Sequence, residues 1–249
     1  MPIDHSRFIA NYDKEIQGDF ARSLYGDSGF YNIGFWADIA EEKKRTSFVA
    51  ASVALVNHMA AADSADEKAK CRDLLDVGCG LGATTACLAG LYDKATIHGI
   101  NLSAAQIEAS RTRCPQGLFQ VMDATKLTFE DASFDRIFCV EAMFYFQTRA
   151  TFLAEARRVL RPGGRLIVTD TLYRRCFGFQ FPTCNLGTDP GIFAQLAEET
   201  GLRLHTSEDI TADTLAPYIE IVRDTGHGRW ARLVETGIAS YHYLVFERP

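Results

Sequence analysis

A short apolar segment that runs into closely spaced glycines constrains the fold of this 249-residue chain more than any other stretch. Residues 74–77 read Leu-Leu-Asp-Val, the glycines follow at Gly78, Gly80 and Gly82, and residues 83–89 have helical character. Glycine lets the backbone adopt positive φ and approach a ligand closely, and the start of a helix presents unpaired N–H groups. The stretch therefore predicts a strand, a tight loop and a helix that bind a nucleotide-like ligand at the carboxyl edge of a parallel sheet.

The spacing of these glycines differs from the Gly-x-Gly-x-x-Gly of dinucleotide-binding proteins. With Asp76 two residues before Gly78, it resembles motif I of the class I S-adenosylmethionine (SAM) dependent methyltransferases. The Leu-Arg-Pro-Gly-Gly at residues 160–164, before an apolar strand, is similar to a second motif of that family. The resemblance covers residues 70–249. It implies a Rossmann-like, doubly wound α/β fold with a seven-stranded sheet and an antiparallel final strand, SAM as the cofactor, and S-adenosylhomocysteine (SAH) as its product.

The resemblance also implies which residues bind SAM. In the family the glycine loop wraps the methionine end of SAM, and Asp76 suits its ammonium group. Asn101 follows Gly82 by nineteen residues, where a doubly wound fold places a side chain on the ribose hydroxyls; most family members have Asp or Glu there. Asp123 matches an acceptor for the adenine amino group, although it could be an ordinary turn residue. The expected cofactor-binding residues are Asp76, Gly78, Gly80, Gly82, Asn101, Leu102, Gln106, Asp123, Ala124 and Glu141.

The chain before the first strand, residues 1–66, carries helical patterns over residues 7–25 and 46–62. Between them, residues 29–36 form a glycine-flanked aromatic run that fits neither a helical nor a strand period. Related natural-product methyltransferases have a similar segment, so we expect residues 1–66 to form a helical lid over SAM and substrate; ordinary capping of the sheet edge is the alternative. Residues 67–249 then form the SAM-binding domain, with residues 172–189 as an aromatic flap.

Methyl transfer from a sulfonium is accelerated by a closed, dry, well-aligned site even without a strong acid or base. Aromatic side chains from the lid and flap could exclude water and hold a flat acceptor, or they could be ordinary core. The candidates for substrate contact are Tyr31, Trp36, Phe144, Phe179 and Phe181.

Many related O-methyltransferases carry a histidine after the fourth strand, and here the matching position holds Tyr145. A phenol with an ordinary pKa of about 10 is a poor base at pH 7. Asp170, at the tip of the fifth strand, is the other candidate to steer a proton. The missing histidine favours an acceptor that needs little deprotonation, such as a ring nitrogen or an acidic N–H or O–H on a heteroaromatic ring.

Composition excludes several classes of function. The net charge of −6 and the absence of a large Lys/Arg cluster disfavour a nucleic-acid substrate. No stretch approaches the ~20 apolar residues that cross a membrane, and the N-terminus lacks a secretory signal pattern. Seven cysteines without a Cys-x-x-Cys pair indicate reduced thiols, not disulfides or a metal site, and hence a cytoplasmic protein. The oligomeric state stays open.

Together these features predict a SAM-dependent methyltransferase that modifies a nitrogen or oxygen of a small aromatic or heterocyclic metabolite. A protein of the same fold that uses SAM as a sensor or for a non-methylating reaction such as cyclisation is the alternative. A protein or RNA acceptor is disfavoured by the acidic charge and by the lack of an added binding domain.

Overall fold

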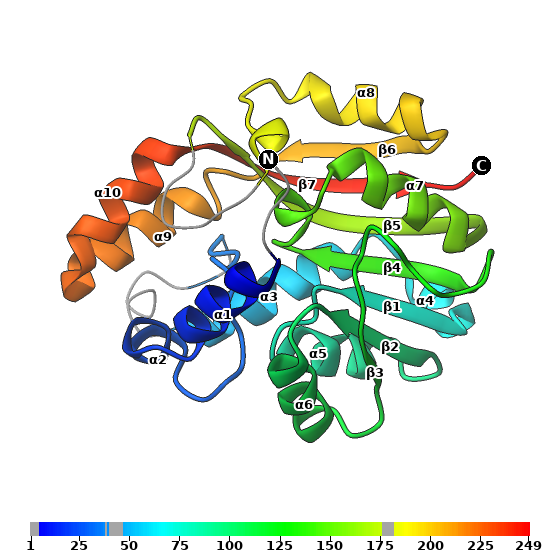
Figure 1. Cartoon of the computed structure of the whole chain (residues 1–249), viewed down its shortest axis with the longest axis horizontal. Helices are drawn as coiled ribbons and strands as arrows, with labels where there is room; N and C mark the ends of the chain where they lie inside the picture. The colour runs from blue at the N-terminus through cyan, green and yellow to red at the C-terminus, as the bar shows by residue number, and fades with distance from the viewer. Residues whose placement is uncertain (1–4, 38, 40–46, 176–181) are drawn as a thin grey trace.

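The computed structural model describes residues 5–37, 39, 47–175 and 182–249 (Figure 1). A seven-stranded sheet in the order β3-β2-β1-β4-β5-β7-β6 runs through the molecule. The strands are β1 (Asp73–Val77), β2 (Thr96–Asn101), β3 (Leu118–Val121), β4 (Phe134–Val140), β5 (Leu160–Tyr173), β6 (Arg203–Asp209) and β7 (Ile238–Glu247). Pairing is parallel from β3 to β5, and β7 is antiparallel to both β5 and β6. This confirms the doubly wound α/β fold with an antiparallel final strand.

The helices alternate with the strands along most of the chain. The α-helices are α1 (His5–Ile16), α2 (Asp19–Tyr25), α3 (Phe48–Ala60), α4 (Ala65–Lys70), α5 (Ala83–Leu91), α6 (Ala104–Arg113), α7 (Arg149–Val159), α8 (Gly191–Thr200), α9 (Leu215–Val222) and α10 (Gly228–Gly237). Short helical turns are η2 (Met143–Tyr145), η3 (Thr183–Asn185) and η4 (Arg223–His227). None of the helices in the described ranges has the length and apolar character needed to cross a membrane.

Successive strand residues point to opposite sides of the sheet, so the apolar strands place hydrophobic side chains on both faces, where helices pack against them. One core cluster contains Leu74 of β1 and Phe138 of β4, together with Leu55 of α3. The other contains their sequence neighbours Leu75 and Ile137, with side chains from α7 and α8. The central strands are therefore covered by apolar side chains on both faces.

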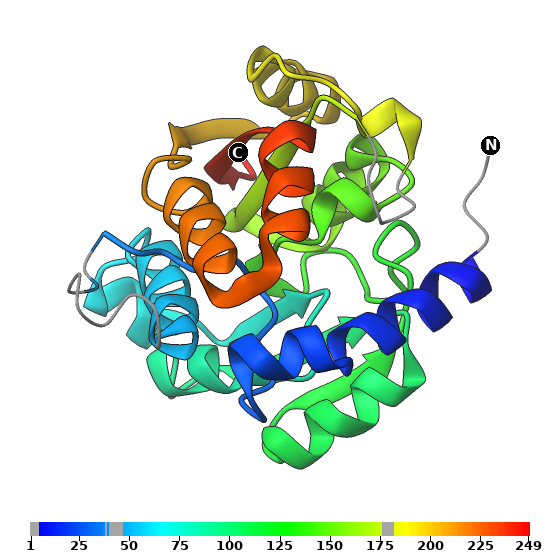
Figure 2. The ribbon, with the colours of Figure 1, turned by 90° about the vertical axis from the view of Figure 1, so that its left-hand side faces the viewer.

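Two pairs of helices that are far apart in sequence lie over the carboxyl ends of the parallel strands. Figure 1 shows α1 with α2 and α9 with α10 on the same side of the molecule, and Figure 2 looks at this side directly. The helical pattern predicted over residues 7–25 is interrupted at Gly18, which separates α1 from α2 and is the N-cap of α2. The helices at the two ends of the chain thus enclose the edge of the sheet at which a doubly wound fold binds its ligand.

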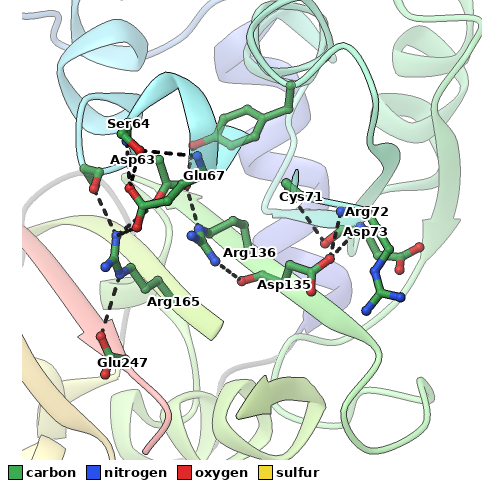
Figure 3. A network of polar contacts seen from close by, with 12 residues as sticks. Asp63, Ser64, Glu67, Cys71, Arg72, Asp73, Asp135, Arg136, Arg165 and Glu247 are labelled. Carbon is green, nitrogen blue, oxygen red and sulfur yellow. Dashed lines mark hydrogen bonds and ion pairs between the residues drawn. The ribbon is translucent and has the colours of Figure 1, made fainter. Parts of the chain in front are cut away.

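A buried network of charges lies at the opposite, amino-terminal edge of the sheet (Figure 3). Asp63, just after α3, accepts from Arg136 Nε at 2.6 Å and pairs with Arg165 Nη1 at 3.0 Å. The Tyr92 hydroxyl donates to the same carboxylate at 2.9 Å. Because these partners come from α3, β4, β5 and the end of α5, the network holds the helix layer against the start of the strands.

Two details differ from the sequence prediction. β5 begins at Leu160 and continues through the Pro-Gly-Gly that was expected to precede it, because Leu160 pairs with Phe134 and Gly163 N–H donates to the Arg248 carbonyl. The expected flap over residues 172–189 is partly regular structure, since Tyr173 ends β5 and Thr183–Asn185 form η3.

Candidate active site

A large cavity opens where β1, β2 and β4 end beneath α1, with an empty volume of about 1210 Å³ that is partly open to solvent. The strand ends and the loops after them line it, as in other doubly wound folds. The predicted cofactor residues in its wall are Asp76, Gly78, Gly80, Asn101, Leu102, Gln106, Asp123, Ala124 and Glu141. The fold therefore brings together nine of the ten residues predicted for SAM.

The glycine loop adopts the backbone conformation that the sequence predicted. Gly78 and Gly80 have φ of 76° and 55°, a region that favours glycine. A Cβ on Gly78 would lie 2.7 Å from the Cβ of Ala142, so a side chain there would collide with the loop after β4. Gly82, with φ of 86°, does not line the cavity; a Cβ there would lie 2.7 Å from Ser110 Cα, so this glycine allows α5 and α6 to pack closely.

Asp76 is a buried carboxylate that has no cationic partner among the described residues. Its described hydrogen bond is from the Thr85 hydroxyl at 2.6 Å. Burial raises the pKa of Asp76 to about 7, and the Thr85 hydrogen bond only partly opposes this. Among the described residues that line the cavity there is no Lys, Arg or His. A cationic group of a ligand could therefore pair with the Asp76 carboxylate. A wall with this carboxylate and without described cations fits the positively charged ammonium and sulfonium groups of SAM.

Asn101 and Asp123 both use part of their hydrogen-bonding capacity within the protein. Asn101 Oδ1 accepts from Ser103 N–H, and its Nδ2 donates to Gln106 Oε1, each at 3.0 Å. Asp123 Oδ1 accepts from the backbone and the hydroxyl of Thr125, both at 2.8 Å. Asp123 therefore stabilises a turn, as its alternative interpretation suggested, and also faces the cavity.

A second cavity, with an empty volume of about 580 Å³, adjoins the first beneath the helices at both ends of the chain. The two cavities share lining residues, among them Tyr12, Tyr31, Glu141 and Tyr145. The rest of the wall is mainly aromatic and comes from α2 and the loop after it, η2, β5, α9, α10 and the start of β7. Its aromatic members outside the shared set are Tyr25, Phe144, Tyr173, Tyr218 and Trp230. None of the described residues in this wall is Lys, Arg or His.

Glu141 lines both cavities and has a constrained backbone with φ of 50°, which is uncommon for a residue other than glycine. Its N–H donates to the Thr169 carbonyl at 3.2 Å, which holds the backbone at the end of β4. Its Oε1 accepts from Ile33 N–H and from the Tyr241 hydroxyl, each at 2.8 Å. Burial raises the pKa of Glu141 to about 7. This carboxyl group can therefore gain or lose a proton near neutral pH.

The structure places the two predicted catalytic residues differently. Tyr145 lines both cavities, and burial together with neighbouring phenols raises its pKa well above 10. It therefore forms part of the aromatic wall, stays protonated near neutral pH and offers even less phenolate as a base than a free tyrosine does. Asp170 lines neither cavity. It is buried and pairs with Arg149 Nε at 2.6 Å. Arg149 also donates to the carbonyls of Thr171 and Asn185, so the pair anchors the chain after β5, and a proton-steering role for Asp170 does not fit this geometry.

The predicted substrate residues also separate into groups. Tyr31 and Phe144 line the second cavity. Trp36 is only 1% exposed, packs edge-on against Phe48 and donates from Nε1 to the Ile33 carbonyl, so it belongs to the core that supports the loop after α2. Phe179 and Phe181 lie outside the described residues.

Sequence reasoning missed most of the second cavity. Tyr12, Tyr25, Tyr173, Tyr218 and Trp230 lie in helical or strand patterns in which an aromatic side chain normally packs in the core. The one local signal was on α1, where Phe8 and Tyr12 lie one turn apart and face Tyr145 at ring-centroid distances of 5.2 and 5.7 Å.

Comparison with known proteins agrees with this arrangement. Residues 75–168 match the family described as a methyltransferase domain. The chain is 38% identical over 148 residues to O-methyltransferase cnsE of Penicillium expansum, which covers 57% of this chain and 51% of the relative. It is 30% identical over 200 residues to O-methyltransferase resE of Aspergillus sclerotiorum, and this match covers 74% of this chain and 72% of the relative. The chain spans about half the length of the first curated relatives that it matches.

Among solved structures, the [4+2]-cyclase SpnF has a similar fold, with a TM-score of 0.69, 22% identity and 96% of each chain covered.

Proposed function

Because this chain belongs to the class I SAM-dependent methyltransferase family, we propose that it transfers a methyl group from SAM to a hydroxyl oxygen of a small aromatic or heterocyclic metabolite. The observation that carries this proposal is the position of Glu141, a partly buried carboxylate with a pKa of about 7 in the wall shared by the two cavities.

The first cavity is the proposed SAM site. Asp76 receives the ammonium of the methionine end, because it is buried and has no cationic partner among the described residues. Asn101 faces the ribose hydroxyls, and the oxygen of Asp123 that the Thr125 turn does not use faces the adenine amino group. SAM, when bound, supplies a methyl group activated by attachment to a positively charged sulfur.

Glu141 is the proposed proton acceptor. Both hydrogen bonds described at this carboxylate end at Oε1, so Oε2 can accept from an acceptor hydroxyl. A base works best when its pKa lies near the working pH, and a pKa of about 7 meets that condition. The proton of the acceptor hydroxyl moves to Glu141. A histidine after the fourth strand is then unnecessary, and hydroxyl acceptors are no longer disfavoured.

The second cavity is the proposed acceptor site. Its tyrosine and tryptophan walls suit a flat, largely apolar molecule with a few hydrogen-bonding groups. No cation lines it among the described residues, and Glu141 is itself negative when ionised. A phosphate or carboxylate on the acceptor would be buried without a counter-charge, which is costly. We therefore assign an uncharged acceptor. Transfer to oxygen is in line with the O-methyltransferase names of the relatives.

Helix α1 and residues 29–36 serve in this proposal as the lid predicted from the sequence, and α9 with α10 closes the opposite side. Phe8 and Tyr12 of α1 pack on Tyr145, so the aromatic walls meet across the opening. Exclusion of water from this enclosure strengthens the electrostatic effect of Glu141.

The test is incubation of the purified protein with methyl-labelled SAM and an extract of its source cells. We expect label in the organic-soluble fraction, which supplies the product for identification. With that acceptor, Glu141→Gln should lower kcat by ~10²–10⁴-fold because it removes the proton acceptor. Tyr145→Phe, which alters the same wall but leaves the carboxylate, should cost less than ~10-fold. A loss of ~10³-fold in Tyr145→Phe with an active Glu141→Gln would contradict the assignment of the base.

A non-methylating reaction such as cyclisation is the second candidate, because a [4+2]-cyclase shares this fold over 96% of both chains. Retention of SAM without transfer of label to any fraction would favour this candidate. Label confined to the acid-precipitable fraction would instead indicate a macromolecular acceptor.

A further inference from the structure

A carboxylate on the lid helix connects to the hydrogen-bond chain at the end of β2. Asp13, on α1, accepts from the Ser103 hydroxyl at 2.8 Å and from Gln106 Nε2 at 2.5 Å. Gln106 in turn accepts from Asn101 Nδ2, and Asn101 Oδ1 accepts from Ser103 N–H. Asn101, Ser103 and Gln106 all line the first cavity, whereas Asp13 lies behind them.

The hydrogen bonds that link Asp13, Gln106 and Asn101 run in one direction, because Asp13 can only accept. An ionised carboxylate has no hydrogen to donate. Gln106 must therefore turn its NH₂ toward Asp13 and its oxygen toward Asn101. Asn101 must then give its NH₂ to Gln106 and its oxygen to Ser103 N–H. This direction follows from the chemistry of the groups, independently of how the amide atoms are assigned.

We propose that Asp13 is a positioning residue for the cofactor: from the lid, it fixes the orientation of the Asn101 amide and supplies the negative charge that the end of β2 lacks. The inference rests on the proposed SAM site. An amide fixed in this way keeps one N–H and one oxygen lone pair available for a neighbouring diol such as a ribose. The cofactor site is thus complete only when α1 is docked, which links closure of the lid to cofactor binding.

Moving the carboxylate from position 13 to position 101 tests the proposal. Asn101→Asp alone places carboxylates on both sides of Gln106, whose amide has only one NH₂ to offer, so the Kd for SAH should rise ~10-fold or more. Asp13→Asn alone allows both directions of the chain, and the Kd should rise ~3–10-fold. In the double variant Asp13→Asn, Asn101→Asp the Gln106 amide can turn round, so that its NH₂ donates to the carboxylate at position 101 and its oxygen accepts from the amide at position 13. Every group in the hydrogen-bond chain then has a partner. Its Kd should return to within ~3-fold of wild type.

The measurements are SAH affinity by calorimetry, the KM for SAM against kcat, and the melting temperature of each variant. For Asp13→Asn, the proposal requires that the Kd for SAH and the KM for SAM change while kcat and the melting temperature stay close to wild type. Asp19→Asn, which removes the same charge from an exposed position on α2, is the matched control and should leave the Kd unchanged.

If Asn101→Asp weakens SAH equally with and without Asp13→Asn, the two positions are independent and the role of Asp13 is contradicted. Failure of the wild-type protein to bind SAH would contradict the proposed SAM site itself, and the inference with it. The two failures are therefore distinguishable in one set of titrations.

Discussion

The two edges of the sheet bury carboxylates in opposite ways. At the amino-terminal edge, Asp63 is surrounded by the guanidinium groups of Arg136 and Arg165 and a phenol (Figure 3). At the carboxyl-terminal edge, Asp76 is equally buried and Glu141 is partly buried, but their described hydrogen bonds come from hydroxyl and backbone N–H groups. Neutral donors offset the lost hydration less than cations do, so burial raises the pKa of both groups to about 7.

The difference in pairing distinguishes carboxylates that stabilise the fold from carboxylates that are available to a ligand or a proton. A paired buried charge holds elements together and tolerates no loss of a partner. A buried carboxylate without a cation costs folding free energy at neutral pH, and such groups cluster where a ligand or a proton is to be received. The comparison predicts that variants at the two edges change stability in opposite directions.

The largest effect is expected at the amino-terminal edge. Asp63→Ala leaves Arg136 and Arg165 buried without their shared partner and should lower the free energy of unfolding by about 3–5 kcal/mol. Asp66→Ala is the matched control, since Asp66 forms an exposed pair with Lys70 at 3.7 Å, and it should cost less than about 1 kcal/mol. Denaturant titration measures both. Equal effects of the two variants would contradict a supporting role for the network.

A smaller effect of opposite sign is expected at the carboxyl-terminal edge. The folded-state pKa of Asp76 lies above its unfolded value, so the native state binds more protons between about pH 4 and 7, and the contribution of Asp76 to stability falls as pH rises through that window. Asp76→Asn should therefore stabilise the ligand-free protein by on the order of 3 kcal/mol at pH 8, and much less at pH 4.

The same Asp76→Asn variant should bind SAH about 10- to 100-fold more weakly, because it loses a charge-assisted hydrogen bond to the ammonium group. Melting curves across pH and calorimetry check the two halves of this prediction. An Asp76→Asn protein that is less stable than wild type at pH 8 would contradict the idea that burial of the ionised Asp76 carboxylate lowers the stability of the ligand-free protein.

The sequence predicted nine residues of the first cavity's wall because their signals are local. Gly78 and Gly80 follow an apolar strand directly, and Asn101 and Asp123 end the next two strands, so a parallel sheet brings them to one edge whatever the side-chain packing. The boundaries of β5 were less predictable, because Gly163 and Gly164 are held in the strand by Arg248, more than eighty residues away.

The second cavity, which is the proposed acceptor site, depends on contacts that no local pattern reveals. Tyr12 comes from the first helix and Tyr218 and Trp230 from the last two, so the second cavity exists only after both ends of the chain have packed on the sheet. Asp170 was expected at the tip of the fifth strand, but β5 continues to Tyr173, and the partner of Asp170, Arg149, lies on a different element. Each of these residues has an ordinary structural interpretation in sequence.

The central claim is that no described residue at the carboxyl-terminal edge supplies a counter-charge to Asp76, so that a cationic ligand can supply it. The most direct measurement is the number of protons exchanged when SAH binds at pH 7, obtained by calorimetry in buffers of different ionisation enthalpy. We predict net proton release, because an ammonium beside Asp76 lowers its pKa from about 7, and a smaller release in Asp76→Asn. Binding without proton release, or with proton uptake, would contradict the claim.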